Sequence, residues 1–532
     1  MSRRSAYIHP PRLGLTGALR AVGKCLIGLP AAFCAAAQWL GILTIPATIG
    51  AHFRQTSYAF APDIQLAEWR TAPPETTSIS TRVLSMRIAE APWAWIAAVV
   101  IPVLLLAPAI WNGYPLLEYD TGGYLARWYE GYLEPSRSTV YGIYLYLGKD
   151  SFFWANLTFQ ALLTLWILQL TLRVLGMAQP LRLLAIATFL TLATALPWLA
   201  SMLLTDIFAG LAVLALFVLV VQAKLSTIER VSLFLYTSFA AATHTATFGV
   251  LFGLCCAGWI VKPLLGRRLP VAGLVQGCLT LVAGAAMLMA ANFALSGHLA
   301  WTPGGAGVSF GRMMQDGIVA RYLNDHCDKI KLKLCPYRNQ LPATADDFLW
   351  GKDSIFNKLG RFEGMNDEME FIATEALAAY PLWQTEAAVE ATAEQLVQVG
   401  TGEGSSGWIP HTYGIIERYL PEQVKVMRAA RQQHWSIKFA AINWVHIPVA
   451  LASMLLLAGI ALAALWRRRI DDLELLAITV CVALLGNAFI CGVISGPHNR
   501  YGARMVWIAT FVVLIAAARS LAARYGSASR PA

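Results

Sequence analysis

Glu118 and Asp120 are two acidic residues that follow directly on an apolar run from Trp93 to Ile110. They stand two apart among tyrosines, in a chain of which only 14% of the residues are charged. A carboxylate at the edge of a membrane is costly to place, so ionisable residues in such positions are functional by default. Chemically, this pair can take a proton from a hydroxyl group or hold a divalent cation.

Further ionisable residues lie at the ends of other apolar runs. Asp206 occurs in LLTDIFAG, His244 in AATHTATFG, and His498, Arg500 and Arg504 in SGPHNRYGARMVW. The two arginines stand four apart, so on a helix they share one face, where they can bind a phosphate through paired hydrogen bonds. Two structural alternatives stay open, because Asp206 is also typical of a helix N-cap and His244 of a buried core histidine.

A glycine-rich stretch, WTPGGAGVSFGR, ends at Arg312. Its glycines allow positive φ angles and close approach of the backbone, so that N–H groups there can point at an anion beside Arg312. An ordinary loop that leaves a helix is equally compatible with this pattern.

The composition places these residues in a membrane protein. Of the 532 residues 57% are hydrophobic, which is more apolar surface than one soluble core of this length needs to bury. The formal net charge of +10 lies in short clusters between the apolar runs, which is typical of cytoplasmic loops rather than of a surface that binds nucleic acid. These clusters are Arg173 and Arg182, Lys224 and Arg230, Arg267 and Arg268, and Arg467 to Arg469.

The expected fold class is an all-α polytopic membrane protein with about ten transmembrane helices and a helical extracytoplasmic domain. The helices are predicted near 93–111, 151–172, 183–200, 206–223, 231–244, 249–265, 270–295, 441–466, 473–495 and 504–523. With both ends cytoplasmic, every basic cluster falls inside. The segments 112–150, 201–205, 296–440 and 496–503 then fall outside, so the ionisable residues at the helix ends all face the same outer side.

The chain is expected to divide into four parts. Residues 1–90 form an N-terminal extension of uncertain topology, whose apolar run Cys25 to Gly50 fits a signal sequence, an interfacial hairpin or sequence upstream of the true start. Residues 91–295 carry helices 1–7 with the acidic first loop, 296–440 the extracytoplasmic domain, and 441–532 helices 8–10 with a cytoplasmic tail.

Two cysteines, Cys327 and Cys335, lie eight apart in the segment HCDKIKLKLCPY of the large outer loop. This short spacing in an oxidising compartment predicts a disulfide. A zinc site that uses His326 together with both cysteines is the alternative, although no second pair of ligands follows.

At these residues the chain resembles the glycosyltransferase C superfamily of integral membrane transferases, which includes protein O-mannosyltransferases, the lipid A aminoarabinose transferase and the catalytic subunits of oligosaccharyltransferases. These proteins carry an acidic pair of the D/E-x-D kind in the first outer loop, and here that motif reads Glu118-Tyr119-Asp120. Asp206 matches their second acid, in the next outer loop, and 296–440 matches their large outer domain after the seventh helix. The resemblance spans roughly residues 93–523.

The resemblance implies an enzyme that moves a sugar from a polyprenyl-phosphate donor to a lipid, glycan or protein acceptor of the cell envelope. It implies a place among the lipids of the bacterial inner membrane, with the site on the periplasmic face, and inversion at the anomeric carbon. Asp120 is the expected general base, and Glu118 is expected to position it or to share a metal ion with it.

The other candidate residues receive supporting roles. A divalent cation, Mg²⁺ or Mn²⁺, is an open possibility that would involve Glu118, Asp120 and Asp206. Tyrosines of the first loop are candidate platforms for a sugar or an acceptor. The expected donor-phosphate ligands are Arg500, Arg504, Arg312 and His498, and further site residues are His244, Tyr119 and Tyr124.

Three other functions compete with this hypothesis. A transporter or flippase of lipid-linked sugars also needs outer arginines and a cavity, but it predicts acids at mid-membrane depth in paired half-helices. An enzyme resembling an O-antigen polymerase or ligase, or an acyltransferase, would use His244 or His498 as base and would leave Glu118 and Asp120 without a role. A structural scaffold gives no reason for so many ionisable groups on one side.

Overall fold

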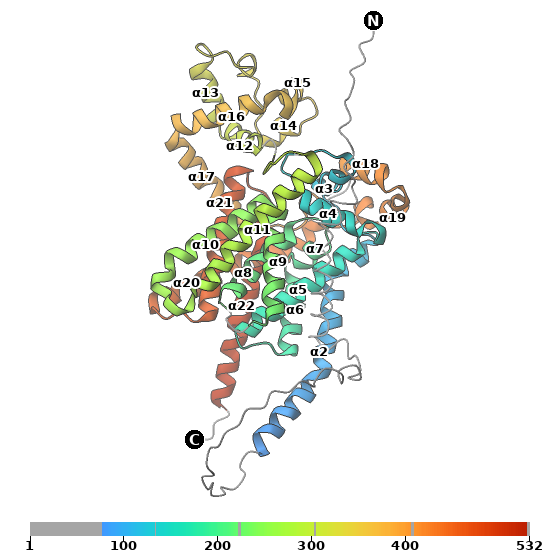
Figure 1. Cartoon of the computed structure of the whole chain (residues 1–532), viewed down its shortest axis with the longest axis vertical. Helices are drawn as coiled ribbons and strands as arrows, with labels where there is room; N and C mark the ends of the chain where they lie inside the picture. The colour runs from blue at the N-terminus through green and yellow to red at the C-terminus, as the bar shows by residue number, and fades with distance from the viewer. Residues whose placement is uncertain (1–76, 134, 222–224, 303–304, 406–408, 529–532) are drawn as a thin grey trace, which may run out of the picture. The chain divides into compact units, whose positions relative to one another are not determined.

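The computed structural model describes residues 77–133, 135–221, 225–302, 305–405 and 409–528 (Figure 1). The run Cys25 to Gly50, with its three interpretations, lies outside the described residues. The chain divides into two units, of which the smaller includes residues 77–100 and 179–181 and the larger includes 101–178 and 182–528. The larger unit holds every residue of the predicted site.

The described residues form helices and no strand, with one isolated bridge between Leu116 and Met202, which confirms the all-α class. Seven helices are long and apolar enough to cross a membrane, which supports a membrane protein. They are the part of α2 (Thr77–Asn112) from Pro92 onward, α5 (Trp154–Val174), α10 (Thr245–Leu265), α11 (Val271–Ser296), α20 (Phe439–Arg467), α21 (Asp472–Ile494) and α22 (Asn499–Ala528).

Three shorter helices occupy the remaining predicted spans. The apolar helices α6 (Pro180–Ala193) and α8 (Asp206–Val221) and the 17-residue helix α9 (Thr227–Thr243) are each shorter than a typical span of about 20 residues. The short helix α7 (Leu196–Ala200) follows α6. Each of the ten predicted segments therefore contains helix, although 183–200 is divided between α6 and α7, and the number of membrane crossings stays a prediction.

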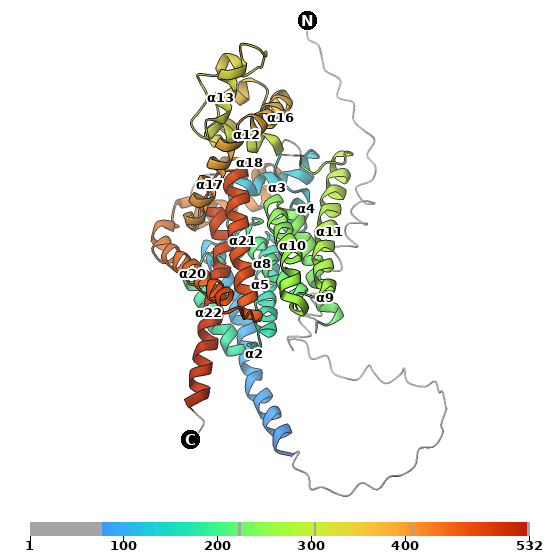
Figure 2. The same ribbon diagram turned by 90° about the vertical axis from the view of Figure 1, so that its left-hand side faces the viewer.

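Helix α8 lies at the centre of the helical bundle. Its residues from Asp206 to Val220 are all buried, and it packs against α5, α9, α11 and α22 (Figures 1 and 2). A helix that its neighbours surround needs no polar face, which explains why its sequence after Asp206 is wholly apolar. Asp206 is its first residue, so the fold holds this acid at one end of the bundle.

The first predicted outer loop is itself helical. After α2 the chain turns at Gly113, whose φ of 87° favours glycine, and forms α3 (Tyr119–Glu130), α4 (Thr139–Gly148) and the short η1 (Lys149–Ser151). Glu118 is the N-cap of α3, and its carboxylate accepts the Asp120 N–H while its own N–H donates to the Thr121 hydroxyl. This capping box fixes the acidic pair at the start of α3.

The segment 296–440 consists of two parts that pack differently. The first part gathers at one end of the bundle in both views and has a hydrophobic core of its own, which includes Phe310, Phe348 and Met369 (Figures 1 and 2). Its elements are α12 (Gly305–Gln315), α13 (Ile318–His326), η3 (Cys335–Tyr337), α14 (Ala345–Leu349), α15 (Ile355–Lys358) and α16 (Arg361–Ala379).

The second part packs onto the bundle and the first loop. Helix α17 packs against α21, and α18 packs against α3. The elements of this part are α17 (Pro381–Val397), α18 (Pro410–Tyr419), η4 (Pro421–Gln423), α19 (Val424–Ala429) and η5 (Arg431–His434). The expectation of one outer domain therefore applies to the first part only, because the second part covers the predicted site.

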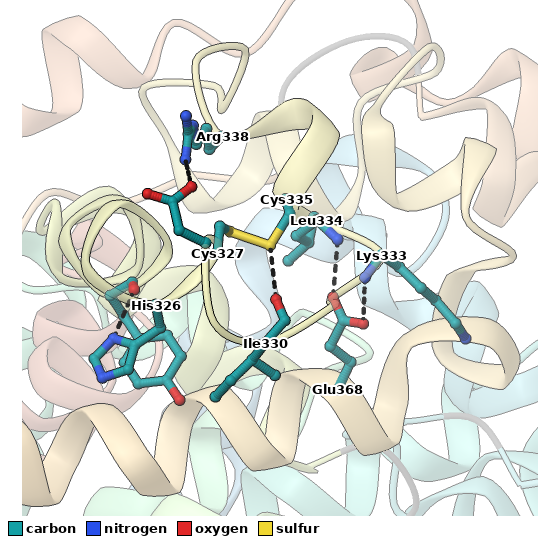
Figure 3. Close-up of a disulfide and its surroundings, with 10 residues drawn as sticks. His326, Cys327, Ile330, Lys333, Leu334, Cys335, Arg338 and Glu368 are labelled. Carbon is teal, nitrogen blue, oxygen red and sulfur yellow. Dashed lines mark hydrogen bonds and ion pairs between the residues drawn. A yellow bond between two sulfur atoms is a disulfide. The ribbon is translucent and has the colours of Figure 1, made fainter.

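A disulfide joins Cys327 and Cys335, whose Cα atoms lie 5.6 Å apart (Figure 3). The loop between them is held by Glu368 of α16, whose carboxylate accepts the N–H groups of Lys333 and Leu334 (Figure 3). The Nδ1 atom of His326 bonds to the backbone of its own helix. The zinc alternative is not supported, because both sulfur atoms are bonded to each other.

Candidate functional site

Glu118 is buried at the start of α3 and faces Arg500 of α22. Its side chain is only 1% exposed, and its Oε1 accepts a hydrogen bond of 2.7 Å from Arg500 Nη1. Burial raises the pKa of Glu118 to about 8, although Arg500 and the Asp120 N–H act in the opposite direction. This residue therefore holds the local structure together and can keep a proton near neutral pH.

Asp120 lies between two arginines. One of its oxygens, Oδ1, pairs with Arg137, and the other, Oδ2, accepts a hydrogen bond of 2.9 Å from Arg500 Nη1. Burial alone would raise its pKa, but Arg137 and Arg500 outweigh burial and lower the pKa of Asp120 to about 2. With 15% of its side chain exposed, Asp120 is ionised at neutral pH and more accessible than Glu118.

Asp206 faces both arginines of α22. Its Oδ2 lies 3.8 Å from Arg500 Nε, and its Oδ1 lies 3.7 Å from Arg504 Nη1. Asp206 Oδ1, Arg500 Nε and Arg504 Nη1 are buried, and none has a hydrogen-bond partner within the described part of the chain. Buried polar atoms left in this way mark a place where a ligand or water completes the structure.

Arg504 is fully buried and held from α21. Its Nε and Nη2 donate to the Asn487 side-chain oxygen at 3.1 and 2.7 Å, and Nη2 also contacts Cys491 Sγ at 3.2 Å. Arg500 and Arg504 lie on one face of α22, as predicted, since both face Asp206. Because Asp120 pairs with Arg500 and Asp206 lies between Arg500 and Arg504, the pair does not offer two uncompensated charges to a phosphate.

The segment 399–405 between α17 and α18 covers the acids. Tyr119 donates its N–H to the Gly404 carbonyl, and Gly404 lies so close to Glu118 that a Cβ atom there would clash with the carboxylate. Glu403 accepts the Arg500 N–H at 2.9 Å, and its other oxygen lies 3.2 Å from His498 Nδ1. This segment was missed in the sequence, although an acid between glycines in GTGEG was a signal for it.

His498 links the site to the first part of the segment 296–440. The hydrogen bond to Glu403 raises its pKa above the usual value for histidine, and Asp346 of α14 lies 4.0 Å from its Nε2. Burial would raise the pKa of Glu403, but His498 and the Arg500 N–H outweigh this and lower it. His498 is therefore at the edge of the charged cluster rather than within it.

His244 lines a small cavity next to the cluster that opens to solvent, and its empty space, open solvent included, is about 360 Å³. Its Nδ1 accepts the Ala246 N–H as the N-cap of α10, so the ring proton is on Nε2. Arg137, the partner of Asp120, lines the same cavity, which we call the Arg137 cavity. Arg137 was also missed in the sequence, although an arginine in an outer loop departs from the positive-inside pattern just as Arg500 does.

A second small cavity, whose empty space with open solvent included is about 320 Å³, lies beside Asp206 and Arg500 and is called the Asp206 cavity. Glu403 and Trp198 also line it. Asp120 pairs with one arginine of each cavity, Arg137 of the first and Arg500 of the second, although Asp120 itself lines neither.

Two predicted site residues, Arg312 and Tyr124, do not lie where expected. Arg312 pairs with Asp316 of its own helix, and no contact among the described residues joins it to the cluster. The expected glycine-rich turn at Arg312 is α12 from Gly305 onward, whose N–H groups enter the helix. Tyr124 is buried against Tyr141 and cannot stack on a sugar, whereas Tyr119 is half-exposed.

The predicted metal site is not present in this arrangement. Among the described residues no three His, Cys, Asp or Glu side chains are grouped as a metal ion requires. The physical reason is that Glu118, Asp120 and Asp206 converge on Arg500 instead of on a common point. Arginine therefore supplies the compensating charge that Mg²⁺ or Mn²⁺ would supply in the alternative with a metal ion.

No protein-family model, no curated protein and no solved structure matches this chain. The case for a function consequently depends on the geometry of the cluster and its two cavities.

Proposed function

We propose that this chain is an integral membrane glycosyltransferase that moves a sugar from a polyprenyl-phosphate donor to an acceptor at the periplasmic face of the bacterial inner membrane. The position of Asp120 supports the proposal. One carboxylate oxygen faces Arg137 of the first cavity, and the other faces Arg500 of the second. A base between two cavities can serve two substrates that meet at one bond.

In this mechanism Asp120 takes the proton of the acceptor hydroxyl group. The hydroxyl oxygen then forms a bond to the anomeric carbon while the bond from that carbon to the donor phosphate oxygen breaks, and the phosphate leaves with the electron pair. Arginine stabilises the charge that develops on the phosphate. Asp120 is ready for this role because its pKa of about 2 keeps it ionised, whereas Glu118 orients the start of α3.

The position of the acids at one end of the bundle favours an enzyme over a transporter. Glu118, Asp120 and Asp206 lie at the first turns or caps of α3 and α8, and Arg500 lies in the first turn of α22. In the proposed topology of about ten spans, these helix ends are all on the outer side. A transporter is expected to hold such acids at mid-membrane depth within broken helices.

The proposal is tested in cells that lack the gene and are complemented with wild-type protein, Asp120→Asn or the control Asp150→Asn. Asp150 belongs to the same outer loop, but its side chain is 87% exposed. Mass spectrometry of lipids and envelope glycans is expected to show that Asp120→Asn cells accumulate a polyprenyl-phosphate sugar and lack one glycoconjugate, like the deletion. Asp150→Asn is expected to restore both.

Protein abundance in the membrane is measured in the same cells by immunoblotting. If Asp120→Asn protein is as abundant as wild type and restores the glycoconjugate, Asp120 is not the base. If the deletion changes no lipid-linked sugar, the proposed function is wrong.

A further inference from the structure

The two cavities beside Asp120 differ in charge. Among the described residues, the side chains that line the Arg137 cavity include one arginine and no acid, whereas those of the Asp206 cavity include Asp206 and Glu403 with a single arginine. A phosphate is repelled by buried carboxylates and attracted by arginine, while a sugar hydroxyl group donates well to a carboxylate. The charge difference therefore selects different ligands for the two cavities.

The Arg137 cavity also offers neutral hydrogen-bond donors. The Nε2–H of His244 is available there because Nδ1 already accepts the Ala246 N–H. Thr245, the first residue of the 21-residue helix α10, lines the cavity, so the positive end of this helix faces it. Ser136 adds a hydroxyl group, whereas the Ser138 hydroxyl already donates to the Ala242 carbonyl.

The surroundings of the cavity fit a lipid rather than a soluble anion. Asn292 and Trp301 line it, and next to them in the chain Phe293 and Leu299 expose apolar side chains. Phe293 belongs to α11, one of the helices that are long and apolar enough to cross a membrane. A phosphate in the cavity can thus carry an apolar chain that lies along the surface of α11.

We propose that the Arg137 cavity binds the phosphate group of a polyprenyl-phosphate lipid through Arg137 and His244, and that the Asp206 cavity receives the hydroxyl-bearing acceptor. This places the phosphate away from Asp206 and Glu403, the two acids that line the other cavity. A guanidinium has five N–H donors, so Arg137 can hold Asp120 and the phosphate together. The Arg137 side chain then contacts both the proposed base, Asp120, and the leaving phosphate.

The test measures equilibrium binding of radiolabelled geranyl phosphate to the full chain in lipid nanodiscs, with geraniol and inorganic phosphate as competitors. Arg137→Gln is expected to weaken binding at least about tenfold, which corresponds to ~1.4 kcal/mol. His244→Asn is expected to weaken binding as well, since asparagine caps α10 but does not reach the cavity as an imidazole does. The control Arg418→Gln removes an exposed arginine and is expected to leave binding unchanged.

The proposal is overturned if Arg137→Gln and His244→Asn both bind geranyl phosphate like wild type, or if Arg500→Gln alone weakens binding. Competition by geraniol equal to that by geranyl phosphate would show that no phosphate is recognised. Equal competition by inorganic phosphate would show that free phosphate, not a lipid, is the ligand.

The identity of the donor in this inference rests on the proposed function, but the two can fail separately. Arg137-dependent binding of geranyl phosphate in a protein that transfers no sugar would contradict the transferase and leave the phosphate site standing. Sugar transfer by a protein whose binding of geranyl phosphate does not depend on Arg137 would support the transferase and contradict the phosphate site.

Discussion

Arg500 is the residue on which the acids converge, and its removal gives the sharpest test of the geometry. Arg500→Gln removes two charge-assisted hydrogen bonds, one of 2.7 Å to Glu118 and one of 2.9 Å to Asp120. Each such bond contributes about 1.5–3 kcal/mol. Together they give about 3–6 kcal/mol, which agrees with the ~3–5 kcal/mol for breaking a buried ion pair.

The loss of stability caused by Arg500→Gln is expected to depend on whether Glu118 is present and on the pH. In the double variant Arg500→Gln/Glu118→Gln the loss should be smaller than the sum of the single losses by about 0.5–3 kcal/mol, because the two residues interact directly. The loss caused by Arg500→Gln should also shrink at acidic pH, where protonation removes the uncompensated charge of the carboxylates.

The assay is reversible unfolding of the purified protein in mixed micelles, titrated with sodium dodecyl sulfate and followed by tryptophan fluorescence. Arg418→Gln is the matched control, because Arg418 is exposed and its pair with Glu130 is long, at 3.9 Å, so a change of at most about 1 kcal/mol is expected. Two results would contradict the contacts assigned to Arg500. In the first, Arg500→Gln is as stable as this control. In the second, the loss of stability in the double variant equals the sum of the losses in Arg500→Gln and Glu118→Gln.

Three further predictions concern the surroundings of the cluster. Gly404→Ala should destabilise the protein by about 1–3 kcal/mol in the same titration, since the φ angle of Gly404 is +76° and the new Cβ atom meets the Glu118 carboxylate. Gly414→Ala is the control, because Gly414 lies within α18 with open space around it, and it should stabilise the protein by about 0.5–1 kcal/mol. His498 should contribute to the free energy of unfolding below about pH 6.5, and this contribution should be lost as the pH rises through its raised folded-state pKa. Wild type should therefore exceed His498→Gln in stability by more at acidic than at alkaline pH. An equal difference at both would contradict this prediction. Reduction of the Cys327–Cys335 disulfide should cost about 2.5 kcal/mol, and alkylation without reductant should leave both cysteines unlabelled.

Much of the helical fold was predictable because an apolar run long enough to cross a membrane predicts a helix. The convergence of Glu118, Asp120, Asp206, Arg500 and Arg504 also followed from placing helix ends on one side of the membrane. What those residues bond to was not predictable, because it depends on tertiary distances. The interaction of Arg500 with Glu118 joins positions 382 residues apart.

The partners that were missed belong to segments without a membrane pattern. Arg137 reaches Asp120 from the connection between α3 and α4, which pack against each other. The segment 399–405 reaches the acids where α18 packs onto α3 and the Tyr119 N–H donates to the Gly404 carbonyl. The same tertiary packing buries Tyr124, and it separates Arg312 from the cluster by giving it Asp316 within its own helix. Hydropathy marks where such residues can lie, but only their contacts decide which of them share a site.

The most direct test of the account is sugar transfer by the purified protein in proteoliposomes. The substrate is the lipid-linked sugar that accumulates in cells lacking the gene, supplied with an envelope fraction of those cells as acceptor, and mass spectrometry follows release of the polyprenyl phosphate. Wild type and Asp150→Asn are expected to release it, and Asp120→Asn is expected to be slower by at least about a hundredfold. Equal release by folded Asp120→Asn protein would contradict the assignment of the base, and no release by wild type would contradict the proposed function.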